Sequence, residues 1–452
     1  MRSEAESPPA WRSSARWAAL ALIPAAAAAL FLSRERLERD LLATSAAEPF
    51  NVVILLVDAL RADRLPFYGH SKPTAPFLSQ LAAEGAVFER AHAASTWTPS
   101  SVASLFTGLY PNQHQVWTGF VMARSAQASD RPLLLNRIPE EAPTLAERMR
   151  ERGYRTFGVS SNANFGEEMG FRRGFERFAH PQRKSGDAVN ESVREWLPEL
   201  RRAQRYFLYL HYMDTHKPYH TREPWSDASA PDPDLARYDS AIGYVDTQIE
   251  ELYRALGWQE RTLLILLADH GEEFGDHGGS GHGNQVYNEL MRVPLVFWWP
   301  GVIGPRRIQD NVSNVDVLPT LEELLGGAAP RTPVAGESLA PLLEGRPMPA
   351  RTLFAMRRAE LDELQRERMA AIRDSWKYIL SLPEQQEELY DTHRDPGEKH
   401  DLIARSPEVA ARLRKDLERF QTEAPRHARA YVESERSASE LADSLRPLGY
   451  VQ

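Results

Sequence analysis

Residues 262–283 read TLLILLADHGEEFGDHGGSGHG. The apolar run that opens this stretch predicts a buried strand, and Asp269 and His270 follow at the point where that strand would end. Open α/β sheets keep their ligand sites at the carboxyl ends of such strands. Carboxylate and imidazole are common metal ligands, and the Gly-rich loop that follows can bring His277 and His282 back over them. The stretch therefore predicts an α/β fold that supports a metal-assisted reaction.

A second strand of the same kind lies near the start of the chain, in NVVILLVDALRADRL, residues 51–65. It delivers Asp58 at its carboxyl end, so two carboxylates from distant parts of the chain can meet at one edge of the sheet. Taken alone, Asp58 is equally well explained as a helix cap or a turn residue. The pair Asp269 and His270 is less easily explained in that way, because adjacent Asp and His before Gly-rich turns have no packing purpose.

A hydroxyl-rich segment, STWTPSSVASLFTGLYPNQH at residues 95–114, lies between these strands. A helix is predicted over 102–107, with Thr98 and Ser101 before it and Gly108 at its end. A hydroxyl at a helix N-terminus faces unpaired N–H groups and the positive end of the helix dipole, which favour an alkoxide or a bound oxyanion. Ordinary helix capping by Ser or Thr is the simpler explanation of this segment taken alone.

The composition is that of an ordinary globular protein. The chain has 452 residues, of which 42% are hydrophobic and 26% are charged, so it can bury a large core. The net charge of -9 gives no indication of a basic surface that would bind nucleic acid, and DNA and RNA are not expected as partners. The chain has no cysteine, which carries little weight for its compartment.

The amino-terminal segment, residues 1–48, differs in kind from the rest of the chain. Its apolar run WAALALIPAAAAALFL, residues 17–32, follows Arg12 and Arg16 and precedes the charged segment SRERLERD. Such a run predicts a signal sequence or a short signal anchor, slightly under the roughly 20 residues that span a bilayer comfortably. A buried core helix is the alternative. We therefore expect an exported protein, either held at a membrane by this segment or secreted after its cleavage.

Three further parts are distinguished by composition and periodicity. A catalytic α/β domain is expected at 49–345, a smaller C-terminal subdomain at 346–423 and a tail at 424–452. The tail is charged and poor in large apolar residues, and its structure is left unassigned. Within the subdomain, residues 351–357 and 376–381 alternate as strands do, and residues 407–423 repeat apolar positions at helical spacing.

A series of sequence blocks runs in order from about residue 51 to residue 402: VDALRADRLPFYGH, TAPFLSQLAAEGAVFERAHA, PSSVASLFTGLYP, FGVSSNANFGEEMGFRRGFERF, HYMDTHKPY, ADHGEEFGDHGGSGHG, MRVPLVFWWPG, SNVDVLPTLEELLG and ELYDTHRDPGEKHDL. In these blocks the chain resembles the sulfatase branch of the alkaline-phosphatase superfamily. Any one block is a weak signal, whereas the whole series is strong. The resemblance implies an alkaline-phosphatase-like core, a mostly parallel sheet flanked by helices, with a smaller C-terminal α+β subdomain.

Carried over position by position, the resemblance assigns metal ligands and a nucleophile. The family's metal-binding aspartate near the first strand falls on Asp58, and its later Asp-Asn or Asp-His pair falls on Asp269 and His270. Counting back from the Thr-Gly that closes the family's nucleophile motif places Thr98 at the nucleophile, where it also joins the ligand set. Counting from the proline instead would select Trp97, which has no nucleophilic atom.

The resemblance also places histidines on the substrate side. His216 matches the family's substrate-side histidine, and His282 stands where many sulfatases carry a lysine against the ester oxygens. Both are expected to offset charge on those oxygens and to assist the leaving group. Without the resemblance, a histidine in a surface loop is the alternative explanation of either residue. His211, at the end of an apolar run, is interpreted as a strand-end histidine satisfied within the fold, with support of a metal ligand as the alternative.

Departures from the family pattern shape the expected chemistry. Because the chain has no cysteine, formylglycine cannot be made from Cys, and none is expected at Thr98. A site with an imidazole and fewer carboxylates suits manganese or zinc better than calcium, with calcium and magnesium as alternatives. We expect one divalent metal ion. Asp214, His216 and His282 offer a second site that the spacing does not require.

Several functions are compatible with these residues. The favoured one is hydrolysis of phosphate or sulfate esters of a small molecule, a lipid or a glycan, through a covalent Thr98 ester. A formylglycine-independent sulfatase and a phospho-headgroup transferase at a membrane surface would use the same residues, but such transferases usually carry several membrane-spanning helices. A non-catalytic anion-binding relative is disfavoured because the full set of site residues is present. The oligomeric state is left open.

Overall fold

The computed structural model describes residues 49–117, 134–227, 229–326, 332–358, 367–428 and 430–433. The predicted signal or anchor segment at 17–32 and most of the tail at 424–452 lie outside these residues, so export and membrane attachment stay predictions. Within the described residues, no helix combines the length and the apolar character that crossing a bilayer requires.

A nine-stranded sheet forms the centre of the larger domain. Its strands are β1 (Asn51–Val57), β2 (Ala86–His92), β4 (Arg155–Ser160), β5 (Arg177–Ala179), β6 (Tyr206–Tyr212), β7 (Thr262–Leu267), β10 (Arg292–Val293), β11 (Leu295–Trp298) and β12 (Arg306–Ser313). They follow the order β10-β2-β11-β7-β1-β6-β4-β5, with β12 paired to β2. The central strands β6, β1 and β7 run parallel and are almost wholly buried, which explains why they read as continuous apolar runs.

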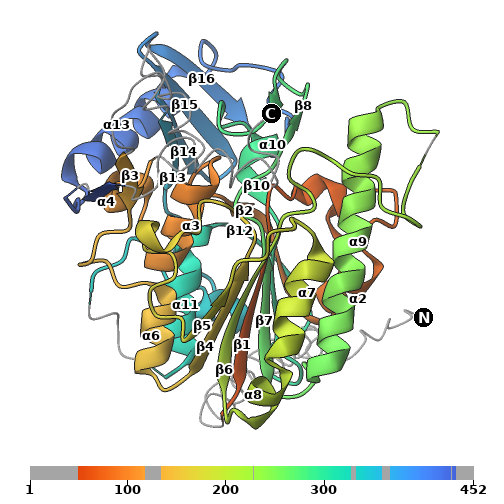
Figure 1. Cartoon of the computed structure of the whole chain (residues 1–452). Coiled ribbons are helices and arrows are strands. Elements are labelled where there is room, and N and C mark those ends of the chain that lie inside the picture. The colour runs from red at the N-terminus through yellow and green to blue at the C-terminus, as the bar shows by residue number, and fades with distance from the viewer. Residues whose placement is uncertain are drawn as a thin grey trace, which may run out of the picture.

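Helices cover both faces of this sheet (Figure 1). On one face lie α2 (Pro76–Glu84), α7 (Gly186–Glu195) and α9 (Pro233–Leu256), and on the other lie α3 (Thr98–Thr107), α6 (Leu145–Glu151) and α11 (Val317–Leu324). The shorter elements are η1 (Ala62–Arg64), η2 (Pro66–Tyr68), α4 (Pro111–His114), η4 (Glu167–Met169), α8 (Leu197–Arg202), β8 (Glu273–Phe274), β9 (Ser280–Gly281), α10 (Asn288–Met291), η5 (Asn314–Asp316) and α12 (Ala340–Leu343). The result is a three-layer α/β arrangement whose ligand site is expected at the carboxyl ends of the parallel strands.

A second, smaller sheet follows in the C-terminal part of the chain. It is antiparallel, in the order β13 (Leu353–Arg358), β14 (Glu367–Arg373), β15 (Trp376–Leu382) and β16 (Gln386–Asp391), and α13 (Pro407–Glu423) packs on it. The predicted strands 351–357 and 376–381 correspond to β13 and β15, and the predicted helix 407–423 is confirmed. A further pair joins β3 (Leu134–Arg137) to β17 (Ala430–Glu433), at the start of the unassigned tail. The predicted fold class, a mostly parallel helix-flanked sheet with a smaller α+β subdomain, is confirmed.

The sequence prediction for α3 was wrong at its start. The helix begins at Thr98, so the residues that were expected to precede it form its first turn. Pro99 is compatible with that position, because the first turn needs no N–H donor and the proline ring already holds a helical φ. The end is as predicted: Gly108 has φ 67°, in the left-handed region that favours glycine.

A buried ion pair within the C-terminal subdomain lies close to the Gly-rich loop, and its glutamate also contacts the main domain. Lys377 Nζ lies 2.9 Å from Glu398 Oε1, and both side chains are fully buried. The backbone N–H of Asn288 donates to Glu398 Oε2 at 2.7 Å, and His277 Nε2 lies 3.1 Å from the Glu398 carbonyl oxygen. His277 also stacks on Tyr287, with ring centroids 3.7 Å apart. The subdomain therefore fixes the outer end of the loop that follows β7.

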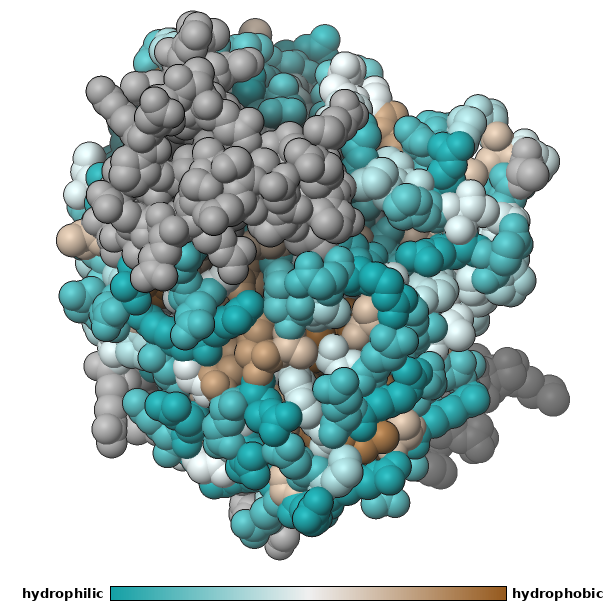
Figure 2. Space-filling model, in the orientation of Figure 1, coloured by the Kyte–Doolittle hydropathy of each residue, from teal (hydrophilic) through white to brown (hydrophobic). Residues whose placement is uncertain are grey.

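The coloured part of the surface in Figure 2 is mainly hydrophilic, with a patch of hydrophobic residues near the middle of the view. This agrees with a globular chain in which 26% of the residues are charged.

Candidate active site

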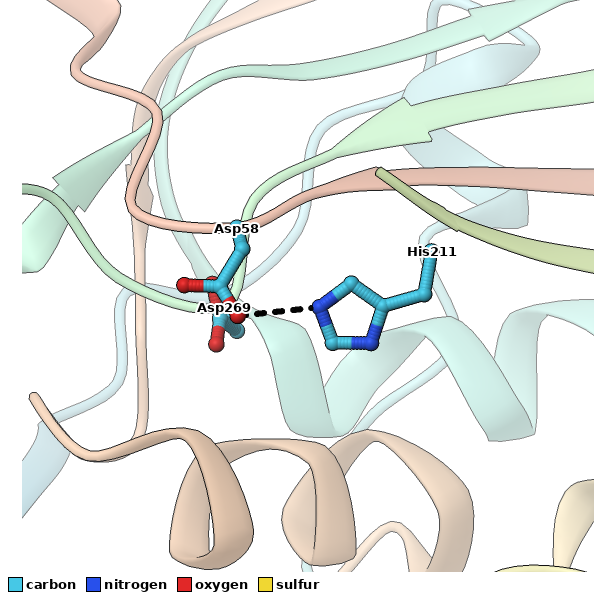
Figure 3. A group of neighbouring side chains, drawn as sticks. All are labelled: Asp58, His211 and Asp269. Atoms are coloured by element: carbon cyan, nitrogen blue, oxygen red, sulfur yellow. Dashed lines mark hydrogen bonds and ion pairs between the residues drawn. The ribbon is translucent and has the colours of Figure 1, made fainter. Parts of the chain in front are cut away.

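The carboxyl edge of the central strands brings the predicted acidic residues together. Asp58 directly follows β1, and Asp269 lies just beyond the end of β7, which pairs in parallel with β1. His211 lies on β6, the other parallel neighbour of β1, and its ring points toward Asp58 (Figure 3). All three side chains are fully buried. The sheet order therefore gathers two carboxylates and one imidazole from three separate parts of the sequence.

Each carboxylate has one oxygen held by donors and one without a donor. Asp58 Oδ2 accepts hydrogen bonds from His211 Nε2 and Asn162 Nδ2, each at 3.0 Å. Asp269 Oδ1 accepts from the backbone N–H groups of Ala59 at 3.1 Å and His270 at 3.0 Å. Among the described residues, Asp58 Oδ1 and Asp269 Oδ2 have no hydrogen-bond donor although both are buried. Buried carboxylate oxygens without a partner are costly, and a cation between them would remove that cost.

His270 presents its free ring nitrogen to the same place. Its Nδ1 lies 2.9 Å from the carbonyl oxygen of Gly271, which can only accept, so Nδ1 carries a proton. Nε2 is 3.1 Å from Thr98 Oγ1, 3.3 Å from Asp269 Oδ2 and 4.0 Å from Asp58 Oδ1. The four predicted metal-site residues thus converge, and their oxygen and imidazole donors suit a divalent cation.

The two buried carboxyl groups differ in how readily they ionise. Burial alone would raise the pKa of Asp58, but the His211 hydrogen bond and the neighbouring imidazoles hold that pKa well below its usual range. For Asp269, burial and the negative charge of Asp58 raise the pKa. The ligand oxygens of Asp58 and Asp269 lie within 4.8 Å of each other, and two ionised carboxylates this close in a buried site repel, so a cation between them would favour ionisation of both.

Three side chains donate hydrogen bonds to backbone carbonyl oxygens next to the site. This role was not predicted for them from the sequence. Ser101 Oγ donates to the Asp269 carbonyl at 2.6 Å, and Thr215 Oγ1 donates to the Asp58 carbonyl at 2.6 Å. Asn314 Nδ2 donates to the Ala268 carbonyl at 2.9 Å. These bonds fix the loops that carry the two carboxylates.

The expected substrate-side histidines lie in a row beside His270. The ring centroids of His270 and His282 are 4.3 Å apart, and those of His282 and His216 are 4.9 Å apart. His282 Nδ1 lies 2.9 Å from Glu272 Oε1; burial opposes the charged imidazole, but the Glu272 carboxylate more than compensates and raises the pKa of His282. Burial lowers the pKa of His216 to about 4, and its Nδ1 lies 2.6 Å from the carbonyl oxygen of Lys217. These surroundings favour the cationic form of His282 and the neutral form of His216.

The optional second metal set is not brought together. Asp214 Oδ1 accepts a hydrogen bond from Arg222 Nη2 at 2.8 Å, and burial, opposed by the Arg222 charge, raises the pKa of Asp214 to about 7. In the part of the chain that the structure describes, the one group of three acidic or histidine donors within 4.8 Å of one another is Asp58, His211 and Asp269. His277, at the outer end of the Gly-rich loop, contacts Glu289 and Glu398 instead of the carboxylate edge.

One cationic residue at the site was missed from the sequence. Lys184 lies on the loop between β5 and α7, with its ammonium nitrogen shielded from solvent. Burial lowers its pKa to about 7, opposed by attraction to Asp58, and its charge in turn lowers the pKa of His216. No motif surrounds this lysine, so its place near the carboxylates becomes visible only in the folded chain.

The protein families and the curated relatives that match this chain are sulfatases or sulphohydrolases. Residues 50–328, more than half of the chain, match the family described as Sulfatase, and residues 275–423 match the family described as N-sulphoglucosamine sulphohydrolase, C-terminal. Arylsulfatase A of Homo sapiens is 28% identical over 458 residues, which covers 81% of this chain and 87% of the relative. Delta 4,5-hexuronate-2-O-sulfatase of Bacteroides thetaiotaomicron is 24% identical over 432 residues, with the same two coverages of 81% and 87%.

Solved structures share the fold. A 2-O GAG sulfatase aligns with a TM-score of 0.69 at 21% identity, over 83% of this chain and 92% of that one. The phosphonate monoester hydrolase of Agrobacterium radiobacter aligns with a TM-score of 0.67 at 20% identity, over 83% and 96%. At such identities the likeness shows a common fold, and the chemistry has to be argued from the residues of this chain.

Proposed function

The chain belongs to the sulfatase family of sulfuric ester hydrolases, and we propose that it cleaves its ester through the unmodified hydroxyl of Thr98 with one divalent cation at the site. The observation that carries this proposal is the contact of 3.1 Å between Thr98 Oγ1 and His270 Nε2, beside the donor-free oxygens of Asp58 and Asp269. Thr98 also begins α3, where the helix dipole favours negative charge on an oxygen.

The cation would be held by Asp58 Oδ1, Asp269 Oδ2, His270 Nε2 and Thr98 Oγ1. When bound, such an ion stabilises negative charge on the ester and makes a coordinated hydroxyl more acidic. The set contains one imidazole and few carboxylates, which suits manganese or zinc better than calcium with its six to eight oxygens.

The proposed reaction has two half-reactions. In the first, Thr98 Oγ1 forms a bond to sulfur or phosphorus while the bond to the leaving oxygen breaks; the hydroxyl proton of Thr98 passes to solvent, and His282 donates a proton to the leaving oxygen. In the second, a water oxygen forms a bond to the same centre and the bond to Thr98 Oγ1 breaks; the water leaves its hydroxyl on the product and gives its other proton to Thr98 Oγ1, and His282 regains a proton from solvent. His282 can act as the acid because Glu272 binds its Nδ1, which leaves Nε2 to face the substrate.

The nature of the nucleophile favours phosphorus over sulfur. A formylglycine hydrate can release sulfate by breakdown of a hemiacetal, a route that a threonine ester lacks. A Thr98 ester has to be cleaved by attack at the central atom, which a bound cation assists at phosphorus. The likeness to a phosphonate monoester hydrolase supports the capacity of this fold for phosphorus chemistry.

A matched substrate panel tests the proposed function. We expect the purified full chain to hydrolyse aryl phosphate diesters or monoesters with a higher kcat/KM than the corresponding aryl sulfate, measured by release of the same phenol. Aryl sulfate turnover above that of every phosphate ester would overturn the preference for phosphorus. Absence of turnover on the whole panel, with the cation added, would contradict the hydrolase proposal.

The acid role of His282 predicts a loss that depends on the leaving group. We expect His282→Gln to lower kcat/KM about 100-fold or more for alkyl esters, whose leaving oxygen needs a proton, and less than about 10-fold for a nitrophenyl ester, which leaves without one. The measurement is kcat/KM over leaving groups of graded pKa. His220→Gln, at an exposed histidine, is the control and should leave the series unchanged. Equal losses for all leaving groups would show that His282 does not act as the acid.

A further inference from the structure

The two hydrogen bonds that reach the Asp58 side chain end on the same oxygen. His211 Nε2 and Asn162 Nδ2 both lie 3.0 Å from Oδ2, while Oδ1 has no donor among the described residues. The donor atoms of Asp58, His211 and Asp269 all lie within 4.8 Å of one another, so proximity alone would admit His211 as a metal ligand. The hydrogen bonding around His211 decides between a ligand and a supporting residue.

The proton on His211 lies on the nitrogen that faces Asp58. An ionised carboxylate can only accept, so at 3.0 Å from Oδ2 the Nε2 atom must carry a proton. On the other side of the ring, Nδ1 lies 3.2 Å from the hydroxyls of Ser160 and Tyr209, which can both donate to it. The Phe165 ring meets the imidazole edge to face, with centroids 5.0 Å apart. The ring is thus held in one orientation, with Nε2–H directed at Asp58 (Figure 3).

The side-chain amide of Asn162 is also held in one orientation. Its Oδ1 accepts from the backbone N–H of Asn164 at 2.9 Å, and a backbone N–H can only donate. The Asn162 Nδ2 group must therefore face Asp58. The backbone N–H of Asn162 in turn donates to Ser160 Oγ at 3.2 Å, which joins it to the hydroxyl that contacts His211. The end of β4 and the end of β6 act together on one carboxylate oxygen.

We propose that His211 and Asn162 are positioning residues that occupy Asp58 Oδ2, so that Asp58 offers only Oδ1 to the divalent cation, and that His211 is not itself a ligand. This inference rests on the cation site of the proposed function. His211 then acts as a hydrogen-bond donor that orients Asp58, in addition to filling its place on a buried strand. His270 is the one imidazole ligand of the cation. Supporting bonds of this kind typically change metal affinity about 10- to 100-fold.

Titration calorimetry of the metal-free full chain with Mn²⁺ tests the positioning role. We expect His211→Leu to raise the dissociation constant for Mn²⁺ about 10- to 100-fold, and we expect Asn162→Ala to raise it as well. His211→Gln can still donate an N–H toward Asp58 and should stay within about threefold of the wild type. Unchanged affinity in both His211→Leu and Asn162→Ala would overturn the proposal. If His211→Leu fails to fold by circular dichroism, Asn162→Ala and His211→Gln carry the test.

X-ray absorption of the Zn²⁺-loaded protein tests whether His211 is a ligand. We expect one imidazole on the ion in the wild type and the same one in His211→Gln. Two imidazoles in the wild type that fall to one in His211→Gln would overturn the assignment. Both measurements are made without substrate, so a failure to hydrolyse esters would contradict the proposed function and leave these results standing.

Discussion

Replacing Thr98 with alanine is expected to lower kcat on phosphate esters by on the order of 10⁴-fold or more, because it removes the atom that forms the covalent ester. The fold should persist, since α3 keeps its Pro99 first turn and its glycine end. Circular dichroism and thermal unfolding check the fold, and steady-state kinetics check the loss. Turnover near the wild-type value in Thr98→Ala would end the nucleophile assignment.

Two further variants separate loss of the hydroxyl from loss of packing at Thr98. Thr98→Val keeps the size and β-branching of the buried side chain without its hydroxyl, so we expect it to be as inactive as Thr98→Ala. Thr98→Ser keeps the hydroxyl and should retain most of the activity.

Mass spectrometry of the wild-type peptide should find Thr98 unoxidised at rest and carrying a phosphoryl group after rapid quenching with substrate. An oxidised residue 98 would contradict the proposed chemistry.

The carboxylate edge could be predicted from the sequence because its signals are local. Asp58 and Asp269 each follow a continuous apolar run, and parallel strands end at the same edge of a sheet. The start of α3 was placed too late, because the prediction began the helix at its first apolar residue and left Pro99 outside it. The error matters little for the site, since Thr98 remains at the helix N-terminus either way.

The supporting residues could not be found in that way. Asn162 and Lys184 lie on loops after β4 and β5, and what brings them to Asp58 is the order β1-β6-β4-β5 across the sheet. His211 was interpreted as a strand-end histidine satisfied within the fold, with support of a ligand as the alternative; its partner, Asp58, is the residue that only the pairing of β6 with β1 identifies. The periodicity of a sequence predicts which face of a strand is buried, but it does not predict which strand lies beside it in the sheet.

Replacing Asp269 with asparagine is expected to abolish most cation binding while leaving the metal-free protein at least as stable. Asparagine Oδ1 can accept the two backbone hydrogen bonds that Asp269 Oδ1 now accepts, but its NH₂ group would take the place of the donor-free Oδ2 and point donors at the cation. Burial and the Asp58 charge already raise the pKa of Asp269, so ionising it in the metal-free fold costs stability above its unfolded pKa, a cost that the neutral amide lacks.

Thermal unfolding at fixed free Mn²⁺ shows both effects of Asp269→Asn. At 100 times the wild-type dissociation constant, the ion stabilises the wild type by about 2.7 kcal/mol, whereas a variant with about 100-fold weaker binding gains only about 0.4 kcal/mol. Asp310→Asn, at an exposed aspartate on β12, is the control and should keep the full gain. Metal analysis after dialysis should find the ion in the wild type and not in Asp269→Asn. Equal occupancy in the two proteins would remove Asp269 from the ligand set, and with it the reason that the two buried carboxylates lie side by side.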